Sequence, residues 1–439
     1  MTRRRPMRRR IAIVMVSVGL PAVLATAAVA QTPSAPDCFP DEATTASSFA
    51  LRDGDRVVFY GDSITHDGGY ARLVEEYVVT RFPGWDVRFY NAGVGGDTVS
   101  GGWAGDAERR LERDVIALHP TMVTVMLGMN DGGYKPYDAE TFSAYAGGYR
   151  AIVKKLKETV PRLTLIRSSP FDDITRPPAF APGYDDVLRR YGCYVTALAA
   201  SERVSTVDFR APVNEGLAAV LATNPALARQ LLPDRVHPSE AGHLVMGAAL
   251  LRAWGAPTLV TRVEIDAARP AVAVAENSDV LDLEATPGRL QWKQEDRALP
   301  LPLNFDDADV ALAEKAGAGL EALDQQVLVV GGLAAGEYDL RIDGTEVGTF
   351  GADALAAGVN LATHGTPMRW QAYEARWAAS DRHELQRVRR GLLANDGDSR
   401  RAKEAAETLA ARDEQQQRHR AFALGPKVRA YELVAVGSR

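Results

Sequence analysis

The chain has 439 residues, of which 46% are hydrophobic and 25% are charged, which is typical of a soluble globular protein with two or three domains. Lys and Arg number 51 against 57 Asp and Glu, so the formal net charge of −6 leaves no basic field to hold a nucleic-acid backbone. Two cysteines are too few for a disulfide scaffold or a four-cysteine zinc site. The core must therefore be held together by hydrophobic burial.

The N-terminus is organised like a secretory signal peptide. The first ten residues hold six arginines, and an apolar run from Ile11 to Ala30 ends in the small-residue triplet Ala-Val-Ala. We therefore predict a signal peptide over residues 1–30, cleaved near Ala30, and export to the periplasm or the cell exterior by either the Sec or the Tat route. An uncleaved membrane anchor is the alternative, since the run approaches the roughly 20 residues that span a bilayer. Residues 31–54 are predicted to be an N-terminal extension, and no later stretch is apolar enough to cross a membrane.

Five short apolar runs alternate with amphipathic stretches between residues 56 and 254. The runs are predicted as strands at Val57–Tyr60, Val87–Tyr90, Met122–Leu127, Leu163–Arg167 and Val204–Phe209. The stretches are predicted as helices at Tyr70–Val78, Ala104–Leu118, Glu140–Val160, Asp185–Ser201, Leu217–Leu231 and Glu240–Trp254. Residues 55–256 are therefore predicted to be an α/β domain with a flavodoxin-like, parallel five-stranded sheet and helices on both faces. In such a fold a ligand site lies at the carboxyl ends of the strands.

The sequence changes character beyond Pro257. Strand-like runs separated by turns predict a small antiparallel β-rich module over residues 257–356, with the clearest hairpin turn at Asp343-Gly344. Two long charged stretches, Met368–Leu393 and Arg400–Ala421, predict a C-terminal helical hairpin within residues 357–439. Its charges are interpreted mostly as a solvated face, and a homodimer through these helices is the protein partner considered.

Four polar or glycine-rich blocks each follow a predicted strand or precede a predicted helix: Gly61–Thr65, Asn91–Thr98, Gly128–Asp131 and Asp234–Pro238. A serine where a strand passes into a helix lies beside backbone N–H groups that stabilise negative charge. Glycines let the backbone approach a ligand closely. Each block alone is weak, since a lone Ser63 is most simply a helix N-cap. Together at one edge of a sheet, a nucleophile, a glycine loop, an amide and an Asp-x-x-His pair indicate an active site.

In this order the blocks resemble those of the SGNH hydrolases, also called the GDSL esterase/lipase family, over about residues 55–255. The resemblance implies that Ser63 attacks an acyl carbonyl, that His237 takes its proton and passes it to the leaving alcohol, and that Asp234 orients His237. It implies an oxyanion hole formed by the backbone N–H groups of Ser63 and Gly96 and the side-chain amide of Asn130. Neither a cofactor nor a metal ion is expected. The Gly-x-Ser-x-Gly elbow of ordinary α/β-hydrolases is absent, which disfavours that class.

Other residues near the blocks carry less weight. Asp62 is assigned a structural hydrogen-bonding role, and His66, one helical step from Ser63, is either a substrate contact or a surface histidine. His243 follows His237 by six residues, which does not place the two rings on one helical face, so a two-histidine metal site is not predicted. Three aromatic residues could form a sugar-stacking platform, although core packing is favoured for them: Trp103, Tyr134 and Tyr137.

In an oxidising compartment Cys38 and Cys193 could pair across a loop of more than 150 residues. Two separate thiols are an equal alternative.

We expect an exported serine esterase that deacetylates a carbohydrate. Export, the appended β-rich module and the absence of an apolar lid segment favour a sugar ester, and no nucleic-acid partner is expected. The alternatives are a lysophospholipase- or thioesterase-type acylhydrolase and a catalytically inactive SGNH binding protein. The complete set of five site residues favours a working enzyme. The sequence leaves open the acyl group, the alcohol, the role of residues 257–439 and the oligomeric state.

Overall fold

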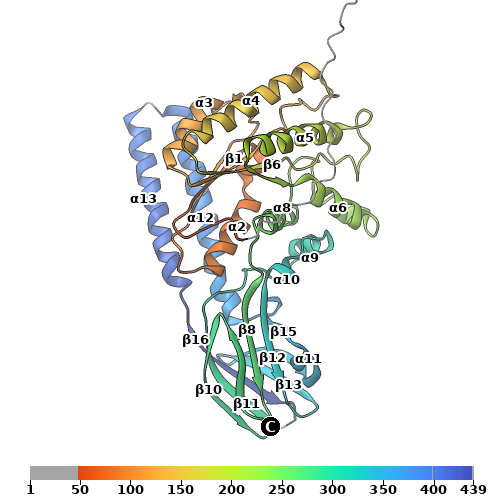
Figure 1. The fold of residues 1–439 in the computed structure, drawn as a ribbon, viewed down its shortest axis with the longest axis vertical. Helices are drawn as coiled ribbons and strands as arrows, with labels where there is room; N and C mark the ends of the chain where they lie inside the picture. Colours follow the sequence, from red (N-terminus) through yellow and green to blue (C-terminus); the bar gives the residue numbers. More distant parts are fainter. Residues whose placement is uncertain (1–47, 398, 438–439) are drawn as a thin grey trace, which may run out of the picture. The chain divides into compact units, whose positions relative to one another are not determined.

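The structure is a computed structural model that describes residues 48–397 and 399–437 (Figure 1). The predicted signal peptide, most of the predicted N-terminal extension and Cys38 lie outside the described residues. Cys193 is disulfide-bonded. None of the helices in residues 48–397 and 399–437 is long and apolar enough to cross a membrane.

A parallel five-stranded sheet forms the centre of the first half of the chain. Its strands are β1 (Arg56–Gly61), β2 (Arg88–Gly93), β5 (Met122–Met126), β6 (Arg162–Arg167) and β7 (Ser205–Asp208), in the spatial order β2-β1-β5-β6-β7. All four strand pairs are parallel. The strands are runs of apolar residues because both faces are covered, and the side chains from Val57 to Tyr60 have no exposed surface. The predicted flavodoxin-like α/β fold is confirmed.

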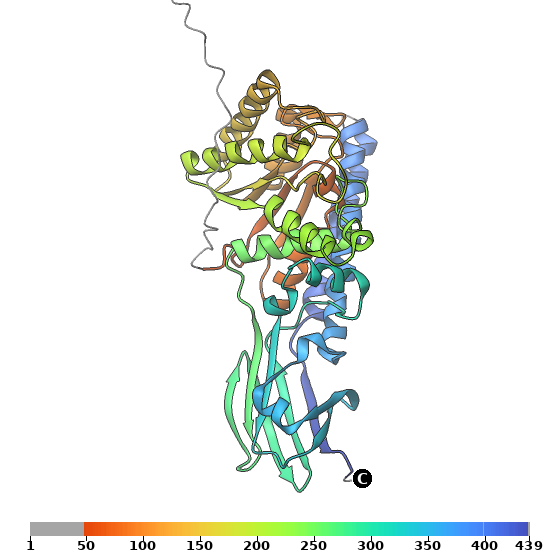
Figure 2. The same cartoon turned by 90° about the vertical axis from the view of Figure 1, so that its right-hand side faces the viewer.

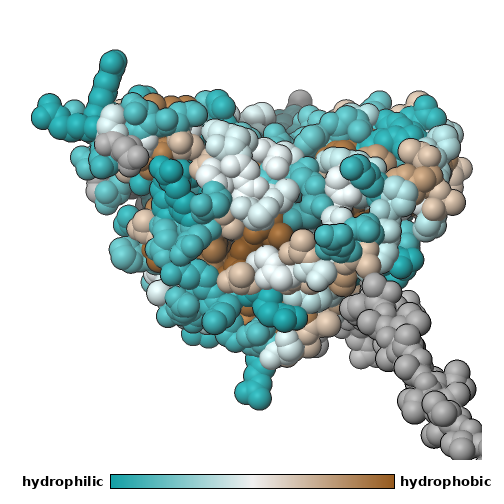
Figure 3. Space-filling model, turned by 90° about the horizontal axis from the view of Figure 1, so that it is seen from above, coloured by the Kyte–Doolittle hydropathy of each residue, from teal (hydrophilic) through white to brown (hydrophobic). Residues whose placement is uncertain are grey.

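Helices cover both faces of this sheet (Figures 1 and 2). α4 (Ala139–Lys157) and α5 (Tyr184–Glu202) lie on one face, and α2 (Gly69–Arg81) and α8 (Glu240–Ala253) lie on the other. The short α1 (Ser63–Asp67) follows β1 directly. Seen from above, hydrophilic residues cover most of the surface, and an apolar area lies near its centre (Figure 3).

Two predicted helices are wrong in their bounds. The helix predicted over residues 104–118 begins only at α3 (Ala107–Arg110), because the glycine-rich residues before it form a short ribbon of β3 (Gly101–Gly102) and β4 (Gly105–Asp106). It continues as a π-helical turn over residues 111–115 and a 3-10 turn over residues 116–118.

The helix predicted over residues 217–231 begins earlier, as α6 (Arg210–Leu221), and is then interrupted. Asn224 caps α7 (Pro225–Ala228) by accepting from the Leu227 N–H at 3.1 Å. A residue before proline avoids the helical region, so the Asn-Pro pair separates the two helices.

The β-rich module contains two sheets. One has the order β15-β12-β8-β9 and the other β10-β11-β16-β13-β14. The strands are β8 (Leu259–Asp266), β9 (Ala271–Glu276), β10 (Ser278–Thr286), β11 (Arg289–Asp296), β12 (Gln325–Gly331), β13 (Glu337–Ile342), β14 (Thr345–Gly351), β15 (Val359–Asn360) and β16 (Val428–Ala435).

Two features of this module depart from the prediction. It is not purely antiparallel, because β8 and β12 pair in parallel. Parallel neighbours need a long crossover, and here it contains α9 (Ala308–Lys315) and α10 (Leu320–Leu323), whose apolar residues join the core of the α/β domain. In addition, β16 follows the helical hairpin in sequence yet lies in the middle of the five-stranded sheet, so the segment predicted as hairpin contributes a strand to the module.

The helical hairpin consists of α12 (Pro367–Asp396) and α13 (Arg400–Ala423), preceded by α11 (Ala352–Ala357). α12 packs against α2 and β2. Its contact with β2 is polar: Gln386 accepts from the Asn91 N–H at 3.0 Å and donates to the Phe89 carbonyl at 3.0 Å. Arg382 donates to the same Phe89 carbonyl at 3.2 Å, and Arg390 donates to the Asn91 carbonyl. Because β2 is an edge strand, these side chains supply partners for backbone groups that no neighbouring strand pairs.

Candidate active site

Ser63 lies where β1 passes into α1. Asp62 caps the helix, since its carboxylate accepts from the Ile64 N–H at 3.1 Å. Gly61 is required here because a Cβ atom would lie 2.7 Å from the Met126 carbonyl of the neighbouring strand. As the first residue of α1, Ser63 has a backbone N–H without a partner inside the helix.

The structure brings His237 and Asp234 to Ser63. His237 Nε2 is 2.9 Å from Ser63 Oγ, and His237 Nδ1 is 2.7 Å from Asp234 Oδ2. The other oxygen, Asp234 Oδ1, accepts from the backbone N–H groups of Val236 at 3.0 Å and His237 at 2.7 Å. With Nδ1–H donating to Asp234, Nε2 is the acceptor for the Ser63 hydroxyl, which is the arrangement that a general base requires.

The electrostatics of Asp234 favour its charged form. Burial raises the pKa of this carboxyl, but the hydrogen bonds from the His237 ring and from the His237 and Val236 N–H groups outweigh burial, so the pKa is below its usual value. Asp234 therefore stays ionised well into the acidic range and can stabilise a positive charge on His237.

The glycine loop after β2 meets the amide after β5. Gly96 has a φ of 74°, a conformation that favours glycine. The Asn130 Nδ2 amide donates to the carbonyl of the adjacent Asp97 at 2.9 Å. The Ser63 N–H, the Gly96 loop and the Asn130 amide thus come from three neighbouring strand ends, as sequence analysis predicted.

Tyr134 is a residue of this site whose role sequence analysis missed. Its hydroxyl donates to Asn130 Oδ1 at 3.0 Å, so both ends of the Asn130 amide are held. The Tyr134 ring lies 5.0 Å from the Tyr184 ring, and Tyr184 donates to the Met129 carbonyl at 2.7 Å. The contact joins residues four apart in a loop, which no regular period signals.

Arg110 is a second missed residue. It is fully buried, forms an ion pair with Asp97, donates to the Ala92 carbonyl and lies 4.8 Å from the centre of the Tyr60 ring. Burial, only partly offset by Arg110, raises the pKa of Asp97. Arg110 thereby anchors both ends of the loop that carries Gly96. A buried arginine 13 residues from its partner leaves no local sequence signal.

Of the two other carboxyls at the strand ends, Asp62 is fully buried and Asp131 is partly buried. Burial raises the pKa of Asp62 to about 7 and that of Asp131 to about 6. Asp131 accepts from the Val99 N–H at 2.9 Å. Both carboxyls serve the backbone around the site, in line with the structural role expected of Asp62.

The three aromatic residues considered as a sugar platform have different surroundings. Tyr137 is half-buried beside Phe142, with ring centroids 5.8 Å apart, as core packing predicts. Trp103 is 61% exposed and donates to the Gly95 carbonyl at 3.1 Å, so the core-packing interpretation is wrong for this residue. Its neighbours in sequence are glycines and Ala104, which offer too little side chain to cover an indole ring.

The two other histidines considered in the sequence, His66 and His243, bond to different partners and not to each other. His66 Nδ1 is 3.2 Å from the Gly93 carbonyl, and His243 is buried with Nε2 2.7 Å from Asp67. In the described part of the chain, no group of three or more His, Cys, Asp or Glu residues is placed to hold a metal ion.

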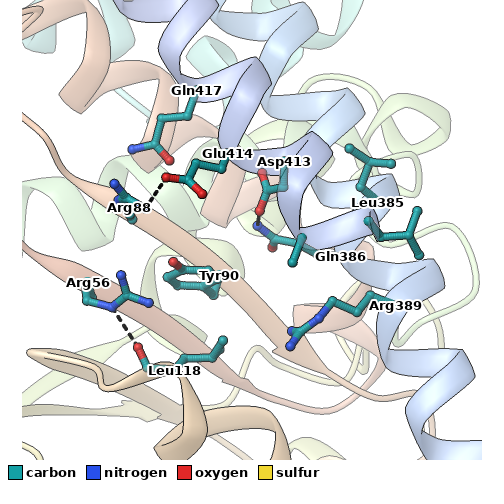
Figure 4. A pocket seen from close by; sticks show the side chains of 12 residues that line it. Arg56, Arg88, Tyr90, Leu118, Leu385, Gln386, Arg389, Asp413, Glu414 and Gln417 are labelled. Atoms are coloured by element: carbon teal, nitrogen blue, oxygen red, sulfur yellow. Dashed lines mark hydrogen bonds and ion pairs between the residues drawn. The ribbon is translucent and has the colours of Figure 1, made fainter. Parts of the chain in front are cut away.

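The Ser63 site is open to solvent on the side of His237 and Asp234. The side chains of His237 and Asp234 are 48% and 57% exposed. A cavity of about 220 Å³ lies elsewhere, between α12, α13 and the start of β1 and β2, and its walls include Arg56, Tyr90 and Arg389 (Figure 4). Arg56 begins β1 whereas Ser63 follows its end, so cavity and site lie at opposite ends of the strand.

Comparison with known proteins agrees with this fold and gives the family. A model of the GDSL-like Lipase/Acylhydrolase family matches residues 59–245. An acetylxylan esterase from Geobacillus stearothermophilus is 33% identical over 226 residues, which are 46% of this chain and 94% of that protein. The crystal structure of the Geobacillus stearothermophilus acetylxylan esterase matches 47% of this chain and 96% of its own, with 29% identity and a TM-score of 0.39. A gut microbial diltiazem-metabolizing enzyme matches 90% of this chain and 100% of its own, with 26% identity and a TM-score of 0.81.

The family model and the acetylxylan esterase relative define an enzyme that hydrolyses ester bonds. The chain belongs to the GDSL-like lipase/acylhydrolase family, the SGNH hydrolases. The family resemblance found in the sequence is thereby confirmed.

Proposed function

We propose that this protein is an exported serine esterase that removes acetyl groups from a carbohydrate through an acyl-enzyme intermediate on Ser63. The observation that carries the catalytic part is the continuous hydrogen-bonded chain from Ser63 Oγ through His237 to Asp234, with contacts of 2.9 and 2.7 Å. Both contacts lie within the reach needed for proton transfer.

In the proposed reaction Ser63 Oγ attacks the ester carbonyl while His237 Nε2 takes the hydroxyl proton. The oxyanion accepts hydrogen bonds from the N–H groups of Ser63 and Gly96 and from the Asn130 amide. The intermediate collapses as His237 protonates the departing alcohol, and the acyl group stays on Ser63. Water then attacks the acyl-enzyme, gives a proton to His237 and releases the carboxylic acid, after which the proton returns to Ser63.

The solvent-exposed side of the site supports a small acyl group on a large alcohol. An exposed His237 and Asp234 leave room for a bulky substrate on the solvent side, and Trp103 provides an exposed ring beside the Gly96 loop. An aromatic face of this kind can pack against a sugar. The acetylxylan esterase relative acts, by its name, on an acetylated polysaccharide. The predicted signal peptide would bring the enzyme to such a polymer.

The test compares Ser63→Ala with the wild-type protein on acetylated xylan and on nitrophenyl esters of increasing acyl length. We expect acetate release by the wild type and a loss on the order of 10⁴-fold or more in the variant, because the nucleophile is removed. Ser143→Ala, an exposed serine on α4, is the matched control and should keep full activity.

Two results would overturn the proposal. Hydrolysis that persists in Ser63→Ala would remove Ser63 from the mechanism. A strong preference for long acyl chains would assign the enzyme to the lysophospholipase or thioesterase type instead.

A further inference from the structure

α12 carries aromatic rings on its solvent-facing side. Trp370 and Trp377 are each 59% exposed, and Tyr373 lies between them. The ring centroids are 5.5 Å apart for Trp370 and Tyr373 and 6.2 Å apart for Tyr373 and Trp377, with interplanar angles of 30° and 36°. The three rings therefore form a continuous stripe, each turned by a similar angle from the one before.

Packing of α12 does not require these rings. Between residues 368 and 379, the stretch that carries the stripe, α12 is packed through other residues: Ala372, Ala375 and Ala379 are fully buried, and Met368 is 1% exposed. An indole with more than half of its surface in water gives up apolar burial that the core of the protein would provide. We therefore infer that the exposed rings contact a ligand rather than stabilise the fold.

The rings are held in place by neighbouring arginines. Arg376 lies 5.9 Å from the centre of the Tyr373 ring and forms an ion pair with Glu76 of α2 at 3.2 Å. Arg369, which is 7% exposed, lies 5.9 Å from the centre of the Trp370 ring. A surface fixed before binding loses less conformational freedom when a ligand arrives.

The stripe is aligned with Glu384. Trp370, Trp377 and Glu384 are spaced by seven residues, so they share one helix face that drifts by only about 20° per heptad. Glu384 lies about 10 Å beyond Trp377 along the helix, at about 1.5 Å per residue. Glu384 forms an ion pair with Arg387 at 2.6 Å.

α12 then passes α1, the helix that carries His66. A Cβ atom on Gly68, which ends α1, would lie 2.9 Å from His383 Nδ1 of α12. His66 is in α1, three residues after Ser63, and its ring contacts the Gly93 carbonyl at the start of the glycine loop. A polymer lying along α12 from Trp370 would therefore run toward the ester-hydrolysing site.

We propose that Trp370, Tyr373 and Trp377 form a stacking platform for the sugar rings of a neutral polysaccharide, which holds the chain while an ester further along it reaches Ser63. The proposal rests on the proposed function for its substrate class. The apolar C–H faces of sugar rings pack on aromatic faces, and successive sugars of a polymer can occupy successive rings.

The surroundings of the stripe favour a glycan over a second copy of this chain. Asp381, Glu384 and Arg387 are exposed along the same stretch of α12. The centre of a protein–protein interface is depleted of charged residues, because burying them against a partner is costly. A hydrated neutral polymer contacts the rings and leaves these charges in water.

The test measures binding and catalysis separately. In a Ser63→Ala background, Trp370→Ala/Trp377→Ala is compared with the parent by affinity electrophoresis in gels containing acetylated xylan. We expect retardation to weaken by about tenfold or more. In the protein that keeps Ser63, the same two substitutions should lower kcat/KM on acetylated xylan while leaving nitrophenyl acetate hydrolysis unchanged. Ala is a strong helix former, so both exposed sites should tolerate it.

Leu281→Ala is the control, because Leu281 is 49% exposed on β10 and lies outside α12. It should leave polymer retardation unchanged. Equal retardation of the parent and the double variant would overturn the platform, and so would light scattering that shows a dimer converted to a monomer by the two substitutions. If nitrophenyl acetate hydrolysis were absent from the wild type, the proposed function would fail, while the gel experiment would still report on the platform.

Discussion

At the scale of single residues, the geometry of the Ser63 site depends on side chains that do not touch the substrate. Asn130 is held at both ends, by Tyr134 at its oxygen and by the Asp97 carbonyl at its nitrogen. Donors contribute to oxyanion stabilisation only when they are aimed before the charge develops. Tyr134 is therefore a positioning residue.

Tyr134→Phe tests this role. The phenyl ring keeps the packing on Tyr184 but loses the O–H that holds Asn130, so the amide can rotate. We expect kcat to fall by about tenfold with KM little changed, a smaller loss than the 10²–10³-fold typical of deleting a donor. Steady-state kinetics on nitrophenyl acetate would measure it, with Tyr137→Phe as the control. An unchanged kcat would show that Asn130 does not need this hydrogen bond.

The buried Asp62 makes stability depend on pH. Burial raises its pKa to about 7, so the folded protein keeps a proton that the unfolded chain releases near the ordinary value of about 3.9. Over the interval between these two values the folded state binds more protons, so this residue makes stability fall as pH rises. Asp131, whose pKa is about 6, acts in the same direction.

Asp62→Asn should remove the contribution of Asp62. The amide oxygen can still cap α1, but no proton is bound or released at this position. We expect the melting temperature to fall less steeply between about pH 5 and pH 7 than in the wild type, as followed by circular dichroism. A slope identical to the wild-type slope would mean that Asp62 ionises normally. Asp53→Asn, at an exposed position, is the control.

At the scale of elements, the hairpin completes the edge of the central sheet. Three polar residues one turn apart on α12, Arg382, Gln386 and Arg390, bond backbone groups of β2, and all three are buried. β2 leads directly into the loop that carries Gly96. The hairpin therefore supports the strand from which one side of the site is built.

Gln386→Leu should expose this dependence. Leucine is of similar size but leaves the Asn91 N–H without its buried acceptor, at about 1–3 kcal/mol, while the Phe89 carbonyl keeps only the hydrogen bond from Arg382. We expect a melting temperature lower by several degrees and a reduced kcat, measured by calorimetry and initial rates. Gln415→Leu, at an exposed position on α13, is the control. A variant as stable and active as the wild type would show that β2 keeps its shape without the hairpin.

The same elements show what sequence could predict. The five strands were predicted because residues such as those from Val57 to Tyr60 form short, uninterrupted apolar runs. Such runs are typical of strands that are buried on both faces of a sheet. The site blocks were predicted because each adjoins a strand or helix end. The contacts of α12 with β2 were not predicted. They are made by buried polar residues, which cannot be told by sequence from the solvated face of a charged helix: Arg382, Gln386 and Arg390. Their partners are about 295 residues away in sequence.

At the scale of the molecule, the α/β domain and the β-rich module are joined by segments that leave one and pack on the other. The segment with α9 and α10 leaves the β-rich module to join the core of the α/β domain, where the Cβ of a residue replacing Gly216 would lie 2.8 Å from Ala316. The acetylxylan esterase relative corresponds to 46% of this chain, whereas the diltiazem-metabolizing enzyme matches 90% of it. The larger arrangement is thus shared with one of these proteins. Propensity could not predict it, because it depends on contacts between segments far apart in sequence.

The position of β16 sets an order of events during synthesis. β11 and β13 flank it on either side: β11 pairs with residues 428–434 of β16, and β13 pairs with residues 431–435. Until the ribosome has added residues 428–435, β11 and β13 each have one edge whose backbone N–H and C=O groups are unpaired. Such edges can pair with strands of other chains. The helical hairpin that precedes β16 must be made first, so the five-stranded sheet of the module is completed late. A ribosome that stopped short of residue 428 would release a chain in which β11 and β13 each have an unpaired edge.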